Sequence, residues 1–217
     1  MKIVFFGDSI TDMRRSYTEK QSSCIWSYGS GYPFLVASDL YRIDPIKYQV
    51  INRGVSGNGV VDLYARIKGD VWNLKPDVLS ILIGVNDVWH EIQSGEGVDL
   101  ARFEKTYRNI IEETLSELPN VKIILCEPFF LKGEATQSTQ SNPTKYERFK
   151  VVYEYAKVVK KLAEEYELCF VPLQEKFNEA SKKFGEEQYL YDGVHPMIAG
   201  ATLIADEWLK VFKELID

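Results

Sequence analysis

Histidine and cysteine are scarce in this chain of 217 residues, which contains two histidines and three cysteines. Two histidines are too few for a histidine-rich metal site, and the sequence has no His-Glu-x-x-His and no Cys-x-x-Cys motif. An odd number of widely spaced cysteines fits reduced thiols. We expect Cys126 and Cys169 in the core, because both lie in apolar runs. The sequence therefore predicts neither a metal site nor a disulfide framework.

Long apolar runs and an excess of positive charge are also missing. No run approaches the roughly 20 apolar residues that cross a bilayer. The apolar segment at the N-terminus ends after Phe6 and is shorter than the core of a secretory signal, which has about 7–15 residues. Lysine and arginine number 26 against 32 aspartates and glutamates, a net charge of −6. This balance argues against nucleic acid or an anionic membrane as a partner, and we expect a cytoplasmic protein.

Five short apolar runs alternate with longer segments of helical periodicity. The runs are rich in Val, Ile, Leu and Phe, as are strands that are covered on both faces, and they occupy residues 2–6, 48–52, 77–83, 121–126 and 168–171. Helical periodicity covers residues 99–118, 144–166 and 196–216. We expect Asp99 to cap the first of these helices and Pro196 to lie in the first turn of the last. The alternation predicts one α/β domain, residues 1–217, with a parallel sheet between helices.

Two long polar stretches follow predicted strands, at residues 11–30 and 127–144. Loops of this length in a compact domain are commonly functional. Both start at the carboxyl edge of the predicted sheet, where open α/β sheets bind their ligands. We therefore expect a binding site at this edge.

A serine follows the first predicted strand directly, in Gly7-Asp8-Ser9. A serine in this place can also cap a helix, so the fragment alone leaves both interpretations open. Near the other end of the chain, Asp192 and His195 lie three residues apart, close enough for a carboxylate to meet an imidazole. His195 alone would also fit a partly buried loop histidine. A nucleophilic serine needs a base, and the base needs an orienting group.

Two further fragments supply hydrogen-bond donors at the same edge of the sheet. Residues 52–59 follow the second strand, and residues 83–89 follow the third. Acyl transfer needs donors aimed at the oxyanion that develops on the substrate, and the backbone N–H of Gly57 and the amide of Asn86 could serve. A plain turn at Gly57 and a loop-closing hydrogen bond at Asn86 are the alternatives.

Taken together, these fragments resemble the four sequence blocks of the SGNH or GDSL hydrolases. The blocks are Gly-Asp-Ser, a glycine after the second strand, Gly-x-Asn-Asp after the third, and Asp-x-x-His-Pro near the end, and they span Ile3 to about Trp208. The resemblance implies a three-layer α/β/α sandwich with a flavodoxin-like, parallel five-stranded sheet, and no metal or other cofactor. The roles that it implies are a nucleophile at Ser9, a base at His195, an orienting carboxylate at Asp192, and oxyanion donors at Ser9, Gly57 and Asn86.

Within this family, residues 8–12, 52–58 and 82–89 look like those of intracellular acetylxylan esterases and related carbohydrate acetylesterases. This implies a serine esterase that removes O-acetyl groups from xylo-oligosaccharides or related sugars, and it is compatible with a homo-oligomer. The residues expected to contact the substrate adjoin the catalytic blocks and are Asp8, Trp89 and Tyr191.

Two other functions remain open at this point. One is a lysophospholipase or thioesterase that acts on longer acyl chains, although the sequence shows no exposed apolar stripe that would hold a fatty chain. The other is a carbohydrate-binding protein on an inactive esterase scaffold. Because no position of the triad or of the oxyanion donors is substituted, the sequence favours an active enzyme.

Overall fold

The sheet of the computed structural model, which describes residues 1–18 and 24–216, has five parallel strands in the order β2-β1-β3-β4-β5. The strands are β1 (Lys2–Gly7), β2 (Gln49–Gly54), β3 (Val78–Leu82), β4 (Lys122–Cys126) and β5 (Cys169–Val171). All five predicted strands are present, and the parallel five-stranded sheet is confirmed. Part of the predicted loop 11–30, residues 19–23, lies outside the described residues.

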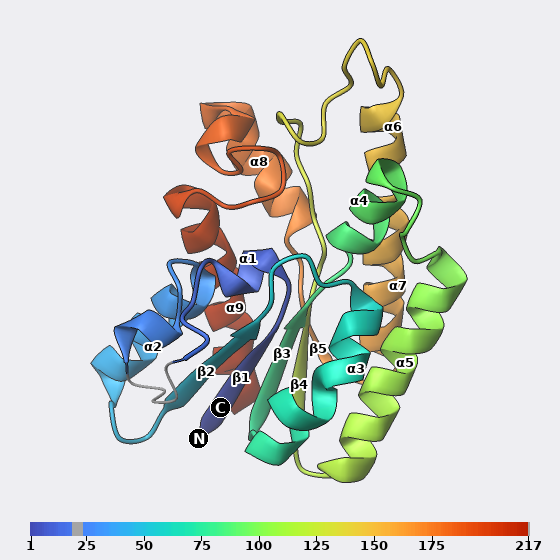
Figure 1. The fold of residues 1–217 in the computed structure, drawn as a ribbon. Helices are drawn as coiled ribbons and strands as arrows, with labels where there is room; N and C mark the ends of the chain where they lie inside the picture. Colours follow the sequence, from blue (N-terminus) through green and yellow to red (C-terminus); the bar gives the residue numbers. More distant parts are fainter. Residues whose placement is uncertain (19–23, 217) are drawn as a thin grey trace.

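Helices cover both faces of this sheet, which gives the predicted three layers (Figure 1). One face carries α3, α5 and α7, which pack side by side, and the other carries α2 and α9. The bounds of these helices are α2 (Tyr32–Ile43), α3 (Val60–Asp70), α5 (Leu100–Glu117), α7 (Val152–Glu165) and α9 (Ile198–Ile216). Within the described residues, no helix combines the length and the apolar character needed to cross a membrane.

The core joins the first strand to the last helix. The ring of Phe5 on β1 lies 4.9 Å from the ring of Trp208 on α9 and 5.4 Å from that of Tyr32 on α2. The indole N–H of Trp208 donates to Ser80 Oγ on β3 at 2.9 Å, so the one polar atom of this buried side chain is satisfied. Truncating a fully buried aromatic side chain of this kind typically costs about 3–5 kcal/mol. The strands that end at the carboxyl edge of the sheet are therefore held by a well-packed core.

The structure differs from the predicted helices in two places. The segment 144–166 is broken into α6 (Lys145–Phe149) and α7, and the last helix begins at Ile198 rather than at Pro196. Pro196 instead forms an isolated antiparallel bridge with Leu190, which closes the turn that carries the predicted base. Cys126 is buried as expected, whereas Cys169 is only partly buried because it lies on the edge strand β5.

Candidate active site

Ser9 is the first residue of α1 (Ser9–Asp12), a single turn of helix directly after β1. Asp8 caps this turn, because its carboxylate accepts the backbone N–H of Ile10 at 2.9 Å. A side chain at Gly7 would lie 2.5 Å from the carbonyl oxygen of Leu82, so only glycine fits where the strand turns. The backbone N–H of Ser9, at the first position of the helix, has no partner within the helix and can donate to a bound group.

His195 and Asp192 meet Ser9 although they lie near the other end of the chain. The hydroxyl of Ser9 is 2.9 Å from His195 Nε2, and His195 Nδ1 is 2.7 Å from Asp192 Oδ2. The other oxygen of Asp192 accepts the backbone N–H groups of Val194 and His195, at 2.9 and 2.8 Å. Gly193 has φ 96°, a conformation that favours glycine and tightens this turn. The structure thus brings the three predicted triad residues into one chain of hydrogen bonds.

His195 and Asp192 each favour the charged form of the other, as the directions of their pKa shifts show. Burial by itself would lower the pKa of His195, but the hydrogen bond and the negative charge of Asp192 raise it above its usual 6.5. For Asp192, burial acts to raise the pKa, and the hydrogen bonds from His195 and Val194 outweigh it and lower the pKa. When neutral His195 donates from Nδ1 to Asp192, its Nε2 is left to accept the hydroxyl proton of Ser9. The other histidine, His90, lies on α4 (Val85–Gln93) and lines a separate cavity.

The two further predicted donors lie at the ends of β2 and β3. Gly57, with φ 84°, is in an exposed turn after β2. Asn86 is 5% exposed in the first turn of α4, and its amide donates to the backbone oxygen of Asn58 at 3.0 Å. One N–H of the amide is used in this bond, so the second can donate to a bound group. The bond also ties the start of α4 to the turn that contains Gly57.

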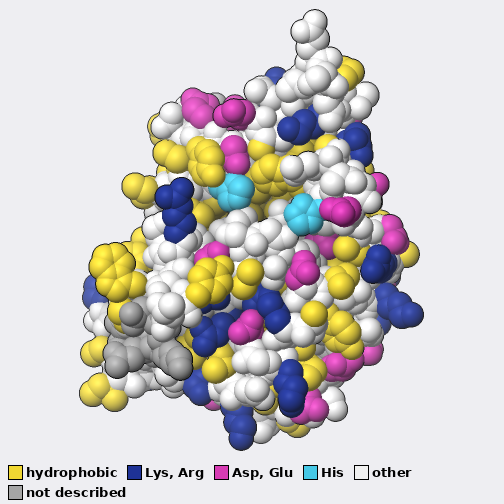
Figure 2. All heavy atoms as spheres, in the orientation of Figure 1, with side chains coloured by type: hydrophobic (Ala, Val, Ile, Leu, Met, Phe, Trp, Pro, Cys, Tyr) yellow, Lys and Arg dark blue, Asp and Glu magenta, His cyan; other side chains and the backbone are white. Residues whose placement is uncertain are grey.

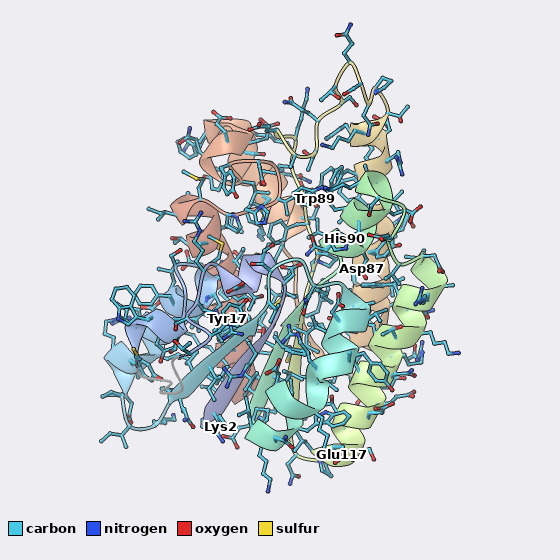
Figure 3. All side chains as sticks on the ribbon, in the orientation of Figure 1. Lys2, Tyr17, Asp87, Trp89, His90 and Glu117 are labelled. Carbon is cyan, nitrogen blue, oxygen red and sulfur yellow. The ribbon has the colours of Figure 1, made fainter. Side chains whose placement is uncertain are left out.

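The three residues predicted to contact the substrate have different surroundings. Tyr191 is 55% exposed and stacks on the imidazole of His195, with ring centroids 5.7 Å apart. Trp89 approaches the same imidazole at 5.9 Å and packs against Phe149, and Figure 3 shows it on α4 beside Asp87 and His90. Asp8 is fully buried, so contact with a substrate does not fit its position. Its carboxylate holds the helix that carries the serine instead.

Two buried carboxyl groups lie beneath the site. Burial is the main cause that raises the pKa of Asp8 and that of Asp87 to about 7, and the charge of Asp8 contributes to the rise at Asp87. Asp87 accepts the backbone N–H of Val60 at 2.9 Å with one oxygen. The second oxygen of each carboxyl group has no hydrogen-bond partner among the described residues. Each group is therefore protonated in an appreciable fraction of the molecules near neutral pH.

Two polar residues that the sequence analysis did not single out hold the strand-end turns in place. Asp12 accepts the backbone N–H and the hydroxyl of Ser56, at 3.0 and 2.7 Å, next to Gly57. Arg66 on α3 donates to Asn58 Oδ1 at 2.7 Å and to the backbone oxygen of Gly7 at 2.9 Å. Asp12 could have been found, because it follows the serine block directly. Arg66 could not, because a single arginine in an amphipathic helix looks like any surface residue.

Two cavities open beside the triad. The catalytic cavity, about 500 Å³, is lined by Ser9, Met13, Arg14, Ser30, Ser56, Tyr191, His195, Pro196, Met197 and Ile198. The second cavity, about 550 Å³, adjoins it and is lined by Met13, Arg14, Ile25, Trp26, Gly29, Ser30, Phe34, Leu35, Ile198 and Ala201. In Figure 2, hydrophobic side chains gather near the histidines on this face. The walls of the second cavity are mostly apolar, whereas the sequence analysis expected no exposed apolar stripe that would hold a fatty chain.

Known proteins resemble this chain in sequence and in structure. Residues 5–203 match the GDSL-like lipase/acylhydrolase family. An acetylxylan esterase of Geobacillus stearothermophilus is 37% identical over 215 residues, which cover 96% of this chain and 92% of that protein. The crystal structure of Axe2, an acetylxylan esterase from the same organism, has a TM-score of 0.82 at 36% identity, over 97% of this chain and 93% of that one. A GDSL-like lipase from Parabacteroides merdae has a TM-score of 0.85 at 36% identity, over 97% and 94%.

These matches extend over almost the whole chain and agree with the site at the carboxyl edge of the sheet. The chain belongs to the GDSL-like lipase/acylhydrolase family. It is a carboxylic ester hydrolase with the α/β/α fold of its structural neighbours.

Proposed function

We propose that this enzyme is a serine esterase that removes O-acetyl groups from xylo-oligosaccharides or related sugars. The observation that carries the proposal is the chain of hydrogen bonds from Ser9 through His195 to Asp192, at 2.9 and 2.7 Å, at the wall of a cavity. A serine, a base and an orienting carboxylate in this order are the requirements for nucleophilic acyl transfer.

The first half of the reaction forms an acyl-enzyme. His195 Nε2 takes the proton of Ser9 Oγ while Oγ bonds to the carbonyl carbon of the ester. The carbonyl oxygen becomes an oxyanion between the N–H groups of Ser9 and Gly57 and the amide of Asn86. The bond from carbon to the sugar oxygen then breaks, and His195 gives its proton to that oxygen. Water repeats these steps on the acetyl-serine and releases acetate.

The relatives support the sugar-acetyl substrate. Those named above include acetylxylan esterases, and one structure of Axe2 is described as an acetyl-xylooligosaccharide esterase. Axe2 has also been solved as catalytic mutants in which a serine, an aspartate or a histidine is replaced by alanine. These are the same three residue types that meet in this chain.

The direct test is acetate release from acetylated xylo-oligosaccharides by the wild type and by Ser9→Ala. We expect the variant to lose at least about 10⁴ in kcat and to keep its fold, because only the nucleophilic oxygen is removed. Ser141→Ala, in an exposed loop, is the matched control and should behave as the wild type. Activity of Ser9→Ala near that of the control would refute the assignment of the nucleophile.

One observation favours an esterase for longer acyl chains, and it is the apolar second cavity. A series of p-nitrophenyl esters from acetate to octanoate separates this alternative from our proposal. A preference for acetate supports the sugar acetylesterase, and a preference for octanoate supports the lysophospholipase or thioesterase. No cleavage of any ester would leave the carbohydrate-binding protein.

A further inference from the structure

The second cavity opens from the catalytic cavity, and both share the walls formed by Met13, Arg14, Ser30 and Ile198. Its remaining walls are almost entirely apolar. Trp26 is 70% exposed and Ile198 is 83% exposed, so two of its large hydrophobic side chains stand uncovered in the described structure. An apolar cavity that adjoins a polar reaction centre is suited to bind an apolar part of a ligand.

The position of His195 indicates which part of the ester faces this cavity. The base returns its proton to the leaving alcohol, so the alcohol lies on the side of His195. From His195 the chain runs directly to Ile198, which lines both cavities. Gly57 and Asn86 are not among the described residues that line the two cavities. We therefore place the second cavity on the alcohol side of the ester, because it adjoins the cavity wall that contains His195 and is lined by neither Gly57 nor Asn86.

Among the described residues that line these cavities, Arg14 alone has a permanent charge, and it lines both. Its neighbour Arg15 is buried and donates to the backbone oxygen of Gly54 at 2.8 Å. The guanidinium of Arg14, by contrast, is exposed and has no hydrogen bond or ion pair within the described residues. A guanidinium that no described residue binds, at the junction of two cavities, is suited to bind a carboxylate of the ligand through two parallel hydrogen bonds.

The backbone that carries Arg14 is strained and firmly held. Met13 and Arg14 have φ 39° and 62°, which are uncommon for residues with side chains. The backbone oxygen of Met13 accepts the N–H of Ser30 at 2.9 Å. A side chain at Gly29 would lie 2.3 Å from the backbone oxygen of Asp12, so the two segments touch closely. Strain of this kind persists where the surrounding structure fixes it, commonly at ligand sites.

We propose that the second cavity binds a uronic acid residue of the substrate, next to the sugar that carries the acetyl group. The C–H face of the uronic acid ring packs on Trp26, and its carboxylate binds to Arg14. A uronic acid combines the flat apolar face and the single negative charge that these walls require. This inference rests on the proposed function, since it places the uronic acid on the alcohol side of a sugar ester.

The test compares two acetylated xylo-oligosaccharides that differ only in one glucuronic acid substituent. We expect the wild type to have a kcat/KM roughly three- to tenfold higher for the acidic substrate, a gain typical of a partly exposed charged hydrogen bond. Arg14→Gln should bring the ratio between the two substrates close to one, and Arg14→Lys should keep part of it. High salt should reduce the preference of the wild type, because it screens exposed charges.

The measured quantity is the ratio of kcat/KM for the two substrates, and a general loss of activity would leave this ratio unchanged. Lys68→Gln removes one positive charge from the exposed face of α3 and should keep the wild-type ratio. Trp26→Ala should lower kcat/KM for the acidic oligosaccharide more than for the neutral one, because only the acidic substrate carries the ring that packs on Trp26. Equal rates on both oligosaccharides, or a preference that survives Arg14→Gln, would overturn the inference and leave the sugar esterase intact. Absence of acetate release from either would instead refute the proposed function.

Discussion

The two sides of Ser9 are built in opposite ways. On the strand-end side, formed by residues 52–59 and 84–89, polar side chains are buried and bonded to the backbone, and Asn86 is 5% exposed. On the outer side, formed by residues 13–15, 24–30 and 191–198, large hydrophobic side chains are exposed, such as Trp26 at 70%. Buried polar groups with fixed partners hold a geometry, whereas exposed apolar walls select a ligand. The contrast suggests that chemistry and selection are divided between the two sides.

The turn from Leu190 to Pro196 is an exception to this division between chemistry and ligand selection. A substitution in this turn has the largest expected effect on kcat. The turn belongs to the outer side, but the bridge between its ends and the bonds of Asp192 make it rigid. Asp192→Asn keeps the shape and removes the charge that fixes the tautomer of His195, so we expect kcat to fall by about 10⁴. The pKa of His195 should also fall, because Asp192 raises it.

A pH profile measures this second effect. The base must be neutral, so the activity of the wild type should be lost as the pH falls below the raised pKa of His195. In Asp192→Asn the residual activity should persist to lower pH. An unchanged acid limb would show that Asp192 does not set the pKa of the base.

The next largest effect is expected on the strand-end side. Asn86→Ala removes the proposed donor to the oxyanion, which should lower kcat by roughly 10²–10³ and change KM little. Asn120→Ala, in an exposed turn at the opposite end of the sheet, is the control. If Asn86→Ala raised KM alone, the strand-end side would take part in substrate binding and the contrast would fail.

The raised pKa of Asp87, a buried acid of the strand-end side, can be tested by the pH dependence of the free energy of unfolding. The pKa of Asp87 is about 7 in the folded chain and has a usual value of 3.8. Between these values the unfolded chain is ionised and the folded chain is protonated, so stability falls as the pH rises. Asparagine cannot ionise. The free energy of unfolding of Asp87→Asn should therefore decline less between pH 5 and pH 8 than that of the wild type, by on the order of 2 kcal/mol. Urea unfolding at both pH values measures it, and parallel declines would contradict the raised pKa.

The smallest expected effect belongs to the outer side. Tyr191→Ala removes an exposed ring that stacks on His195, and an aromatic contact of this kind is worth about 0.5–1.5 kcal/mol. We expect kcat/KM for the sugar ester to fall roughly two- to tenfold. Tyr191→Phe keeps the ring and should retain most of the activity. An equal loss in both variants would assign the effect to the hydroxyl rather than to stacking.

The sequence allowed the strand-end side, and the turn with Asp192 and His195, to be predicted much better than the rest of the outer side. Buried strands are continuous apolar runs, and the blocks after β1, β2 and β3 stand where those runs end. The rest of the outer side depends on contacts between distant segments, such as Ser30 with Met13, for which no local pattern exists. The break between α6 and α7 and the late start of α9 were missed because helical periodicity does not mark where a helix ends.

The burial of Asp8 was also beyond the reach of sequence reasoning. An acidic residue next to a catalytic serine fits a substrate contact, and only the fold decides whether its side chain faces the cavity or the core. The cap that it provides to α1 and the strain at Met13 and Arg14 arise from how segments meet. Local patterns thus locate reacting residues, and tertiary contacts determine their surroundings.

The distance in sequence between Ser9 and His195 has a consequence for the timing of activity during synthesis. The ribosome makes the serine within the first strand and helix and makes the base about 186 residues later. The last helix also carries Trp208, which packs on the first strand. With the proposed base at His195, a growing chain has no base for its serine until its final segment has emerged and folded. The proposed mechanism therefore predicts that activity appears only when the whole fold is complete.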